Sequence, residues 1–291
     1  MVTVLDEPMR LYDFAWPDRF SSRACRHGVL CYFDSGPGPE GTPLVLLHAL
    51  GVNFTQWRHV AQLLAPQQRL IGIDLPGCGH SAKPRHKWQL TDMTAAVIGL
   101  LDELGISRAM IGGHSFGGRV ALELALRHPE RVAGLLLLNS AGFIRYPKLL
   151  ARVGKRLLKP QLIAPIMVAM SQPILGAIVA HPTSPSGEFV ASVTDRFRPE
   201  FAWDFAYHAC PLLPALLSDV IDELPKLQLP TEVLWGRSDR LLRYRTVAPQ
   251  LARLPQARIE VIDDCGHMPN FEQPQIVAQA ALRLAARVRG E

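Results

Sequence analysis

Three residues able to carry out acyl transfer stand at the ends of strand-like runs in this chain. Ser115 lies in the run Gly-His-Ser-Phe-Gly-Gly, between an apolar segment and a segment with helical character. Asp239 follows a β-branched run that begins at Thr231, and His267 follows a similar run over residues 257–262. A serine hydroxyl becomes nucleophilic when a histidine takes its proton and a carboxylate orients that histidine. These three residues are therefore a candidate triad.

The surroundings of Ser115 match a sharp turn between a strand and a helix. Glycines stand two residues before and two residues after the serine, giving the pattern G-x-S-x-G. A serine on such a turn has strained backbone angles, and side chains at the flanking positions would collide with neighbouring backbone. The pattern predicts that the Ser115 hydroxyl is held clear of the sheet, within reach of a base.

The elements that must position the triad alternate along the chain. Short apolar runs are separated by amphipathic segments, which is typical of a mostly parallel sheet covered on both faces. We expect strands at 28–33, 44–48, 70–74, 109–111, 132–139, 231–236 and 257–262, and helices at 57–64, 91–104 and 119–127. The stretch before residue 28 is poorly patterned. All three triad candidates follow strands at the carboxyl edge, where open α/β sheets bind ligands.

The chain resembles the α/β-hydrolase-fold serine hydrolases, in the branch of capped esterases and C–C hydrolases, over nearly its whole length. The motifs that carry this resemblance are Leu47–Gly51, Ile73–Ser81, the Ser115 elbow, Trp235–Asp239 and Gly266–Pro269. The resemblance implies an α/β-hydrolase fold, with a mostly parallel eight-stranded sheet, helices on both faces and an inserted helical cap. It also implies Ser115 as nucleophile, His267 as base and Asp239 as orienting acid. Asp263 and Asp264 are alternative acids, although they lie so close to His267 that we expect them to point away.

The resemblance also suggests where an oxyanion would bind. In this fold the donors are the backbone N–H after the nucleophile, here Phe116, and one from the loop after the strand at 44–48, here Leu50. Ala49 stands where glycine is more usual in the family. His48 and His114 flank the same region. They are candidates for substrate binding, with structural hydrogen bonding as the alternative.

The strand pattern stops after Gly142 and resumes near Leu229, which divides the chain into three segments. We expect the first part of the core at 1–141, a helical cap at 142–228 and the second part of the core at 229–291. Residues 160–187 contain no Lys, Arg, Asp or Glu, so they either line an apolar pocket or pack the cap on the core. The remaining candidates for substrate contact are Met167, Met170, Trp203 and Met268.

A run of basic residues precedes the apolar cap segment. Its members recur at steps near three and four with no acidic residue between them, as on one face of a helix: Arg145, Lys148, Arg152, Lys155, Arg156 and Lys159. We hypothesise that this face contacts an anionic membrane or an acidic protein partner and delivers a lipophilic substrate. A solvated face without a partner is the alternative.

Composition limits the remaining classes of function. The chain has 291 residues, of which 48% are hydrophobic and 20% charged, which suits one domain with a large core. A net charge of +5 is too small to suggest nucleic acid. The start lacks the pattern of a signal peptide and no stretch reads as a membrane span, so we expect a cytoplasmic protein. No metal-ligand or dinucleotide spacing is present, and we expect neither metal nor cofactor.

The residues favour hydrolysis of a carboxylic ester of a largely apolar substrate through an acyl-enzyme on Ser115. Cleavage of a carbon–carbon bond in a diketone-like substrate, lactone opening and thioester hydrolysis use the same triad and remain alternatives. The C–C hydrolases typically carry Trp after the catalytic histidine, where this chain has Met268. A ligand-binding or accessory protein with vestigial activity is the alternative of another class.

Overall fold

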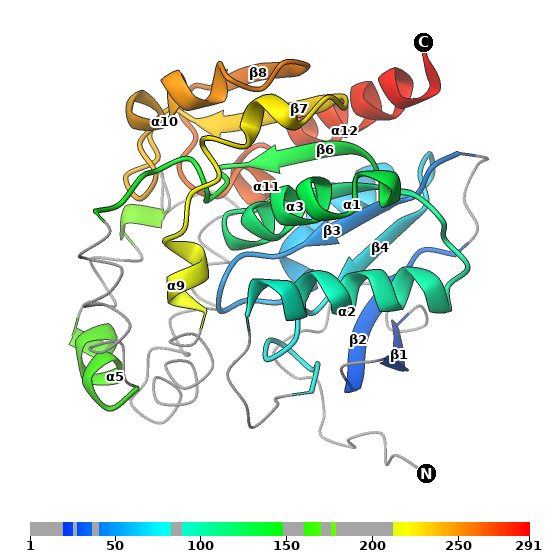
Figure 1. Ribbon diagram of the computed structural model, residues 1–291, viewed down its shortest axis with the longest axis horizontal. Coiled ribbons are helices and arrows are strands. Elements are labelled where there is room, and N and C mark those ends of the chain that lie inside the picture. Colours follow the sequence, from blue (N-terminus) through cyan, green and yellow to red (C-terminus); the bar gives the residue numbers. More distant parts are fainter. Residues whose placement is uncertain are drawn as a thin grey trace.

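A single sheet organises the computed structural model, which describes residues 20–25, 28–36, 41–82, 89–147, 160–169, 176–178 and 212–291. In these ranges the sheet has eight strands in the order β1-β2-β4-β3-β5-β6-β7-β8 (Figure 1). The strands are β1 Phe20–Cys25, β2 Gly28–Asp34, β3 Leu44–Leu47, β4 Leu70–Ile73, β5 Ala109–His114, β6 Val132–Leu138, β7 Thr231–Gly236 and β8 Ala257–Ile262.

The pairing confirms the predicted mostly parallel sheet. β1 pairs antiparallel with β2, and β2 pairs antiparallel with β4. The other neighbours, from β4 through β3, β5, β6 and β7 to β8, run parallel. Every residue of β3, β4, β5, β6 and β7 is buried, because helices cover both faces. β8 is only partly buried, as expected for an edge strand with alternating polar residues.

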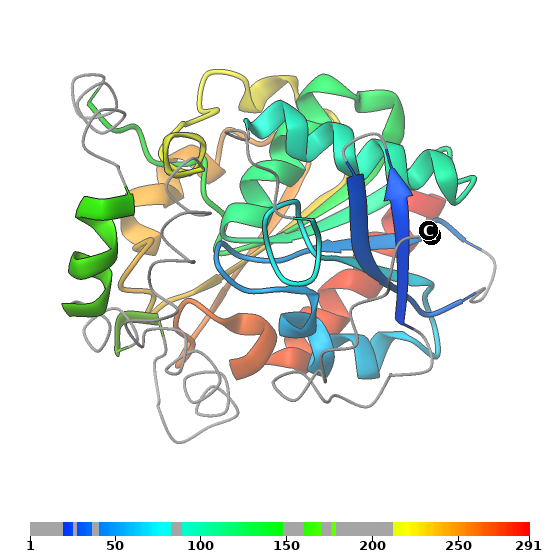
Figure 2. The same cartoon turned by 90° about the horizontal axis from the view of Figure 1, so that it is seen from below.

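The helices form two layers on the sheet (Figure 2). One face carries α2 (Leu90–Glu103), α3 (Phe116–Arg127) and α10 (Tyr244–Leu251), and the other carries α1 (Arg58–Leu64) and α12 (Pro274–Arg289). The shorter elements are η2 Phe54–Trp57, η3 Pro129–Arg131, α5 Pro160–Ala169, α9 Leu213–Leu216, η5 Leu224–Lys226 and α11 Pro269–Glu272.

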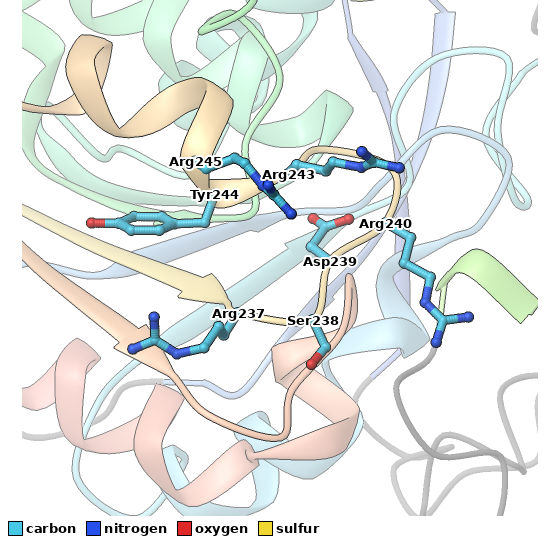
Figure 3. Close-up of a pocket in the computed structure, with 7 residues that line it drawn as sticks. All are labelled: Arg237, Ser238, Asp239, Arg240, Arg243, Tyr244 and Arg245. Atoms are coloured by element: carbon cyan, nitrogen blue, oxygen red, sulfur yellow. The ribbon is translucent and has the colours of Figure 1, made fainter.

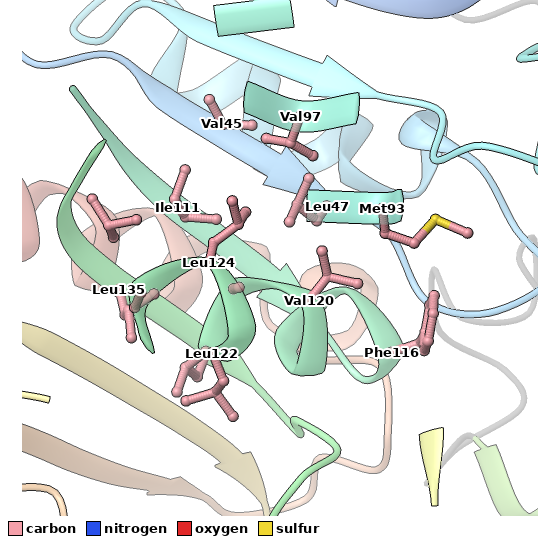
Figure 4. Close-up of a cluster of buried hydrophobic side chains, with 14 of the residues drawn as sticks. Val45, Leu47, Met93, Val97, Ile111, Phe116, Val120, Leu122, Leu124 and Leu135 are labelled. Atoms are coloured by element: carbon pink, nitrogen blue, oxygen red, sulfur yellow. The ribbon is translucent and has the colours of Figure 1, made fainter. Parts of the chain in front are cut away.

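Two apolar clusters fill the spaces between the sheet and these layers. In the first, side chains of α2 and α3 pack on the strands (Figure 4). Its members include Val45, Met93, Val97, Ile111, Val120, Leu124 and Leu135. The second joins the opposite face of the strands to α1 and α12, through residues such as Val60, Leu64 and Leu284. Burial on both faces fixes the strands rigidly, so the loops at their ends have a firm base.

The structure differs from the sequence prediction at several places, among them α10, α11 and α12, for which no helix was expected. β1 was not expected, because its sequence lacks hydrophobic alternation and it is specified by pairing with β2. α3 begins at Phe116 rather than at residue 119, directly after Ser115. η2 precedes α1, in place of a helix that starts at Trp57.

The predicted cap falls largely outside the described residues. Within the predicted cap, the structure describes 142–147, α5, residues 176–178 and residues 212–228. α5 lies on the side of the molecule toward which β6 and β7 point (Figure 1). The cap boundaries at 142 and 228 stay a prediction. In the described ranges, no helix combines the length and the apolar character needed to cross a bilayer.

Candidate active site

Ser115 sits on a strained turn between β5 and α3. Its backbone angles are φ 51° and ψ −110°, a conformation that residues other than glycine rarely adopt. The two flanking glycines explain how the turn closes. A Cβ on Gly113 would lie 2.4 Å from the Gly117 carbonyl oxygen, and a Cβ on Gly117 would lie 2.3 Å from the carbonyl oxygen of Leu47. The turn therefore packs backbone against backbone.

Main-chain hydrogen bonds hold Ser115 in this conformation. Its N–H donates to the Leu138 carbonyl at 3.0 Å, and its carbonyl accepts from the Ala141 N–H at 3.0 Å. Both partners belong to the end of β6 and the residues just after it, so the neighbouring strand supports the turn. The Ser115 residue is only partly buried, so its hydroxyl is near accessible surface.

Asp239 lies in the loop after β7 and is 3% exposed. Its Oδ1 accepts hydrogen bonds from the N–H groups of Leu241 at 2.8 Å and Leu242 at 2.9 Å. Its Oδ2 accepts from the Asn139 amide at 2.5 Å and faces Nδ1 of His267 at 2.8 Å. Burial raises the pKa of the Asp239 carboxyl, but His267 and the Leu242 and Asn139 donors outweigh it, so the pKa is lowered.

His267 follows β8 and is 5% exposed. Its N–H donates to the Ile178 carbonyl at 2.8 Å, which links the loop to the segment between β6 and β7. Because Asp239 occupies Nδ1, that nitrogen carries the proton and Nε2 has the lone pair that a base needs. The alternative acid Asp263 instead pairs with Arg237 on the surface.

The structure joins two members of the predicted triad directly. Asp239 and His267 form a hydrogen-bonded pair, and the His267 ring lies 4.9 Å from the ring of His114, the residue before Ser115. No hydrogen bond between Ser115 Oγ and His267 is recorded among the described residues. Such bonds are often long in unliganded enzymes and tighten when substrate binds.

Asn139 is a site residue that sequence reasoning missed. It directly follows β6, has φ 39° and is fully buried. Its amide nitrogen donates to Asp239, while its amide oxygen accepts from the N–H of Gly236 at 3.2 Å. The one available signal was an amide residue directly after an all-apolar strand, beside the strand that delivers the acid.

The two candidate histidines near the elbow are bound on both ring nitrogens. His48 Nδ1 donates to the Ala49 carbonyl at 2.6 Å, and Nε2 accepts from the N–H of Leu75 at 2.9 Å. His114 bonds to the Gln56 side chain and to the His267 carbonyl. Both histidines are completely buried. These bonds match the structural alternative rather than contact with a substrate.

The two predicted oxyanion donors lie on different elements. Phe116 is the first residue of α3, where helix N–H groups lack partners within the helix. Leu50 lies in the loop after β3, between Ala49 and Gly51. Within the described residues no acceptor is recorded for either N–H. Both groups are therefore available as donors, and their joint role stays a prediction.

The other candidate contacts fall in different places. Met268 is 2% exposed and packs with Val52 and Phe271, next to Ile178. Met167 belongs to α5, whereas Met170 and Trp203 lie outside the described residues. In the basic run, Arg145 pairs with Asp219 and Asp222. Its other members, Lys148, Arg152, Lys155, Arg156 and Lys159, lie outside the described residues.

An open pocket of about 550 Å³ lies beside the Asp239 loop (Figure 3). Its walls are Arg237, Ser238, Asp239, Arg240, Arg243, Tyr244 and Arg245. Neither Ser115 nor His267 contributes to them. The pocket therefore lies next to the candidate triad and not above its nucleophile.

Two buried thiols are poor nucleophiles. Cys31 and Cys265 are free and buried, and Cys78 is also buried. Burial, with a smaller effect of Asp74, raises the pKa of Cys31 to about 12, and burial likewise raises the pKa of Cys265. Because the thiolate is the reactive form, neither Cys31 nor Cys265 is a candidate nucleophile.

Comparison with known proteins identifies the family. Residues 44–280 match the model of the alpha/beta hydrolase family. The chain is 31% identical over 252 residues to the 2-hydroxymuconate semialdehyde hydrolase of Pseudomonas sp. strain CF600, covering 82% of this chain and 84% of that one. It is 30% identical to the dihydrolipoyllysine-residue acetyltransferase component of the acetoin cleaving system of Pseudomonas putida, covering 87% of this chain but only 66% of that protein.

A solved structure agrees with these matches. A thermophilic esterase from Thermogutta terrifontis superposes with a TM-score of 0.72 at 27% identity, over 92% of this chain and 98% of that one. The predicted α/β-hydrolase fold is thereby confirmed, and the chain belongs to the alpha/beta hydrolase family.

Proposed function

We propose that this hydrolase cleaves a carboxylic ester of a largely apolar substrate through an acyl-enzyme on Ser115. The observation that carries the proposal is the 2.8 Å hydrogen bond between His267 Nδ1 and the buried Asp239 carboxylate. This bond selects the tautomer that leaves Nε2 as a base, at the sheet edge that also presents the strained Ser115 turn.

The reaction follows from these roles. Ser115 Oγ attacks the ester carbonyl carbon while His267 Nε2 takes the hydroxyl proton. The N–H groups of Phe116 and Leu50 donate to the oxyanion that forms. When this intermediate collapses, the bond between the former carbonyl carbon and the oxygen of the alcohol group breaks. The imidazolium gives its proton to that oxygen as the alcohol departs. Water then attacks the acyl carbon while the same imidazole takes its proton. The bond from that carbon to Ser115 Oγ breaks, and the imidazolium returns the proton to Oγ, which releases the acid and restores the serine.

Asp239 supports this cycle as an anion. Its lowered pKa keeps it charged at neutral pH, so it stabilises the imidazolium that forms at each step. The donors on both of its oxygens hold the carboxylate in one orientation. The His267 ring therefore does not have to reorient as charge develops.

The preference for an apolar substrate rests on the segment between β6 and β7. α5 contains no charged residue, and its side chains Leu162 and Ile166 are 50% and 56% exposed. An exposed apolar pair of this size, on the side of the carboxyl ends of the strands, suits contact with a lipophilic group. We propose that the segment 142–228 acts as the cap over the site.

Carbon–carbon bond hydrolysis is the second candidate. It is favoured by the likeness to the 2-hydroxymuconate semialdehyde hydrolase, a protein that is 31% identical to this chain. Against it stands Met268, at the position after the base where those relatives typically carry Trp. A diketone from ring cleavage and an ester would both react at Ser115. The two candidate functions are therefore distinguished only by measuring the turnover of each substrate.

A panel of p-nitrophenyl esters of rising acyl length tests the proposal. We expect saturable hydrolysis with a maximum at short to medium chains, and loss of turnover in Ser115→Ala. A diketone substrate run beside the panel measures the second candidate. Background rates on every ester, with turnover of the diketone, would replace the first candidate by the second. Background rates on both, in a folded protein, would favour a binding protein.

We also propose peripheral contact with anionic lipid through the basic run and α5. Arg145 already pairs with two aspartates, so this contact would rest on the other five basic residues of the run, which lie outside the described residues. In the sequence these cations directly precede α5, and a basic segment next to an apolar one is typical of peripheral membrane contact. Co-sedimentation should occur with phosphatidylserine vesicles and not with phosphatidylcholine vesicles. Equal sedimentation with both, or with neither, would contradict this contact.

A further inference from the structure

A buried chain of hydrogen bonds, separate from the triad, connects the loop after β3 to the loop after β8. The N–H of Ala49 donates to Gln56 Oε1 at 2.9 Å. The Gln56 amide nitrogen donates to His114 Nδ1 at 2.5 Å, and His114 Nε2 donates to the carbonyl oxygen of His267 at 2.6 Å. We call these three bonds the Gln56–His114 bridge.

Every donor in the bridge points the same way. A peptide N–H only donates, so the Gln56 atom that faces Ala49 is the oxygen, and its amide nitrogen faces His114. A carbonyl only accepts, so the proton of His114 is on Nε2 and its Nδ1 accepts. Burial, and then the charge of His267, lowers the pKa of His114 to about 3. The bridge is uncharged over the whole range in which a serine hydrolase works.

Burial makes the bridge stiff. Gln56 is 2% exposed and His114 is completely buried. A buried donor or acceptor without its partner is costly, so neither side chain can swing away cheaply. Asn270, at the start of α11, adds a further bond, because its amide donates to the main-chain carbonyl of Gln56 at 2.6 Å. The bridge is therefore tied at Gln56 to the helix that follows His267.

One end of the bridge orients a predicted oxyanion donor. Ala49 is held on both of its peptide groups, by Gln56 at its N–H and by His48 at its carbonyl. In a trans peptide the N–H points opposite to the carbonyl, and the N–H opposite the Ala49 carbonyl belongs to Leu50. The His48 bond therefore sets the direction of the Leu50 N–H, and the Gln56 bond fixes the adjoining His48–Ala49 peptide.

The other end holds the predicted base. The carbonyl of His267 accepts from His114, and the N–H of His267 donates to Ile178. His114 is also the residue before Ser115, so the strand that delivers the nucleophile holds the main chain of the base. The bridge therefore links the loop after β3, the strand that carries Ser115 and the loop that carries His267, and these three must meet during acyl transfer.

Resting on the function proposed above, we propose that Gln56 and His114 are positioning residues for this reaction. Through the Gln56–His114 bridge they keep the oxyanion loop and the base loop in register, and they contact no substrate. They should therefore act on kcat and leave KM nearly unchanged, because only the transition state needs both loops at once.

Variants at both positions test this role, with kcat counted per site titrated by a fluorophosphonate. We expect Gln56→Leu and His114→Leu each to lower kcat by about 10- to 100-fold with KM within about threefold, because small displacements of catalytic groups have large effects. His114→Gln keeps a donor at the position of Nε2 toward the His267 carbonyl, so it should recover most of the loss.

Gln68→Leu is the matched control. Gln68 is also a buried glutamine, 7% exposed, and it donates to the Thr42 carbonyl at 2.6 Å, away from the triad. Its loss should lower the melting temperature and leave kcat per titrated site unchanged. A general packing effect would give Gln56→Leu and Gln68→Leu the same kcat, which would overturn the positioning role.

The rate of Ser115 phosphonylation is a second readout that needs no ester substrate. It should slow in Gln56→Leu and His114→Leu and recover in His114→Gln. If the wild-type chain is labelled and both leucine variants react equally fast, the bridge has no positioning role while the serine mechanism stands. If wild-type Ser115 neither labels nor turns over esters, the proposed function fails, and the positioning role fails with it.

Discussion

Asp239 and Ser115 are held in place by different means. Asp239 is held through its side chain, which accepts from Leu241, Leu242, Asn139 and His267. Ser115 is held through its backbone, by a positive φ and by main-chain bonds to the end of β6. The proposed mechanism needs an acid that keeps one orientation, and these bonds hold Asp239 in one orientation. The nucleophile needs a free side chain on a fixed backbone.

This difference predicts how each residue fails. Damage near Asp239 should alter electrostatics and tautomers while the fold persists. Damage near Ser115 should come through steric collision of main-chain atoms, with stability and activity lost together. The following substitutions separate the two cases.

The largest effect is expected for Asp239→Asn. The amide cannot accept from all of its present donors, and it favours the wrong tautomer of His267, so kcat should fall by about 10⁴-fold. The amide nitrogen of the new Asn would replace one oxygen and leave hydrogen-bond donors without an acceptor. This should reduce the free energy of unfolding by about 1–3 kcal/mol. Steady-state kinetics and urea denaturation measure the two losses. A fall in kcat below tenfold would point to Asp263 or Asp264 as the acid.

Gly117→Ala tests the steric support of the nucleophile. The new Cβ would lie 2.3 Å from the Leu47 carbonyl oxygen and 2.6 Å from that of His48, both backbone atoms. β3 and its following loop must shift, so we expect a loss of about 1–3 kcal/mol in stability and about 100-fold in kcat. Gly176→Ala is the control, since a Cβ there meets no atom of the described residues within 4 Å. Unchanged stability in Gly117→Ala would refute the collision.

Substitutions of Asn139 separate its side chain from its backbone. Asn139→Gly keeps the φ of 39° but removes the amide that donates to Asp239, and we expect kcat to fall by about tenfold. Asn139→Ala removes the same amide and adds about 1 kcal/mol of left-handed strain. The two variants should therefore share one kcat and differ in melting temperature. Equal melting temperatures would show that the backbone relaxes.

The smallest effect concerns acid stability. The pKa of His114 is about 3 when folded, below its ordinary value near 6.5, so only the unfolded chain takes up this proton between those values. The free energy of unfolding should therefore decrease as the pH is lowered through that window, by about 1.4 kcal/mol per pH unit for each such histidine. His48, whose pKa burial also lowers against the effect of Asp74, adds to the slope.

His114→Gln removes one of these protons. Between about pH 6 and about pH 4, the free energy of unfolding should depend less steeply on pH in this variant than in the wild-type chain, by about 1.4 kcal/mol per pH unit. Denaturation curves recorded at several pH values measure this slope. The same slope in wild type and His114→Gln would show that His114 is protonated in the folded chain.

The sequence predicts the parts of this site that depend on local pattern. Ser115, Asp239 and His267 each follow a recognisable strand, and Gly113 and Gly117 mark the turn. The parallel sheet is equally readable, because β3, β5 and β6 are short apolar runs. Each of these signals lies within a few residues of the position that it predicts.

The parts missed are those that depend on long-range contacts. Asn139 meets Asp239 across 100 positions, and Gln56 meets His114 across 58. The sequence around Asn139 or Gln56 contains no pattern that identifies the residue to which its side chain bonds. β1 is similar, since only its register with β2 makes a strand of a sequence without alternation. Side-chain bonds between elements follow from the assembled sheet and not from local pattern.

Intact-protein and peptide mass spectrometry after treatment with a fluorophosphonate tests the central claim most directly. The account predicts one adduct per chain, mapped to Ser115, that is absent in Ser115→Ala and forms far more slowly in Asp239→Asn. An adduct on another residue, or equal labelling of the wild-type and Ser115→Ala chains, would contradict it.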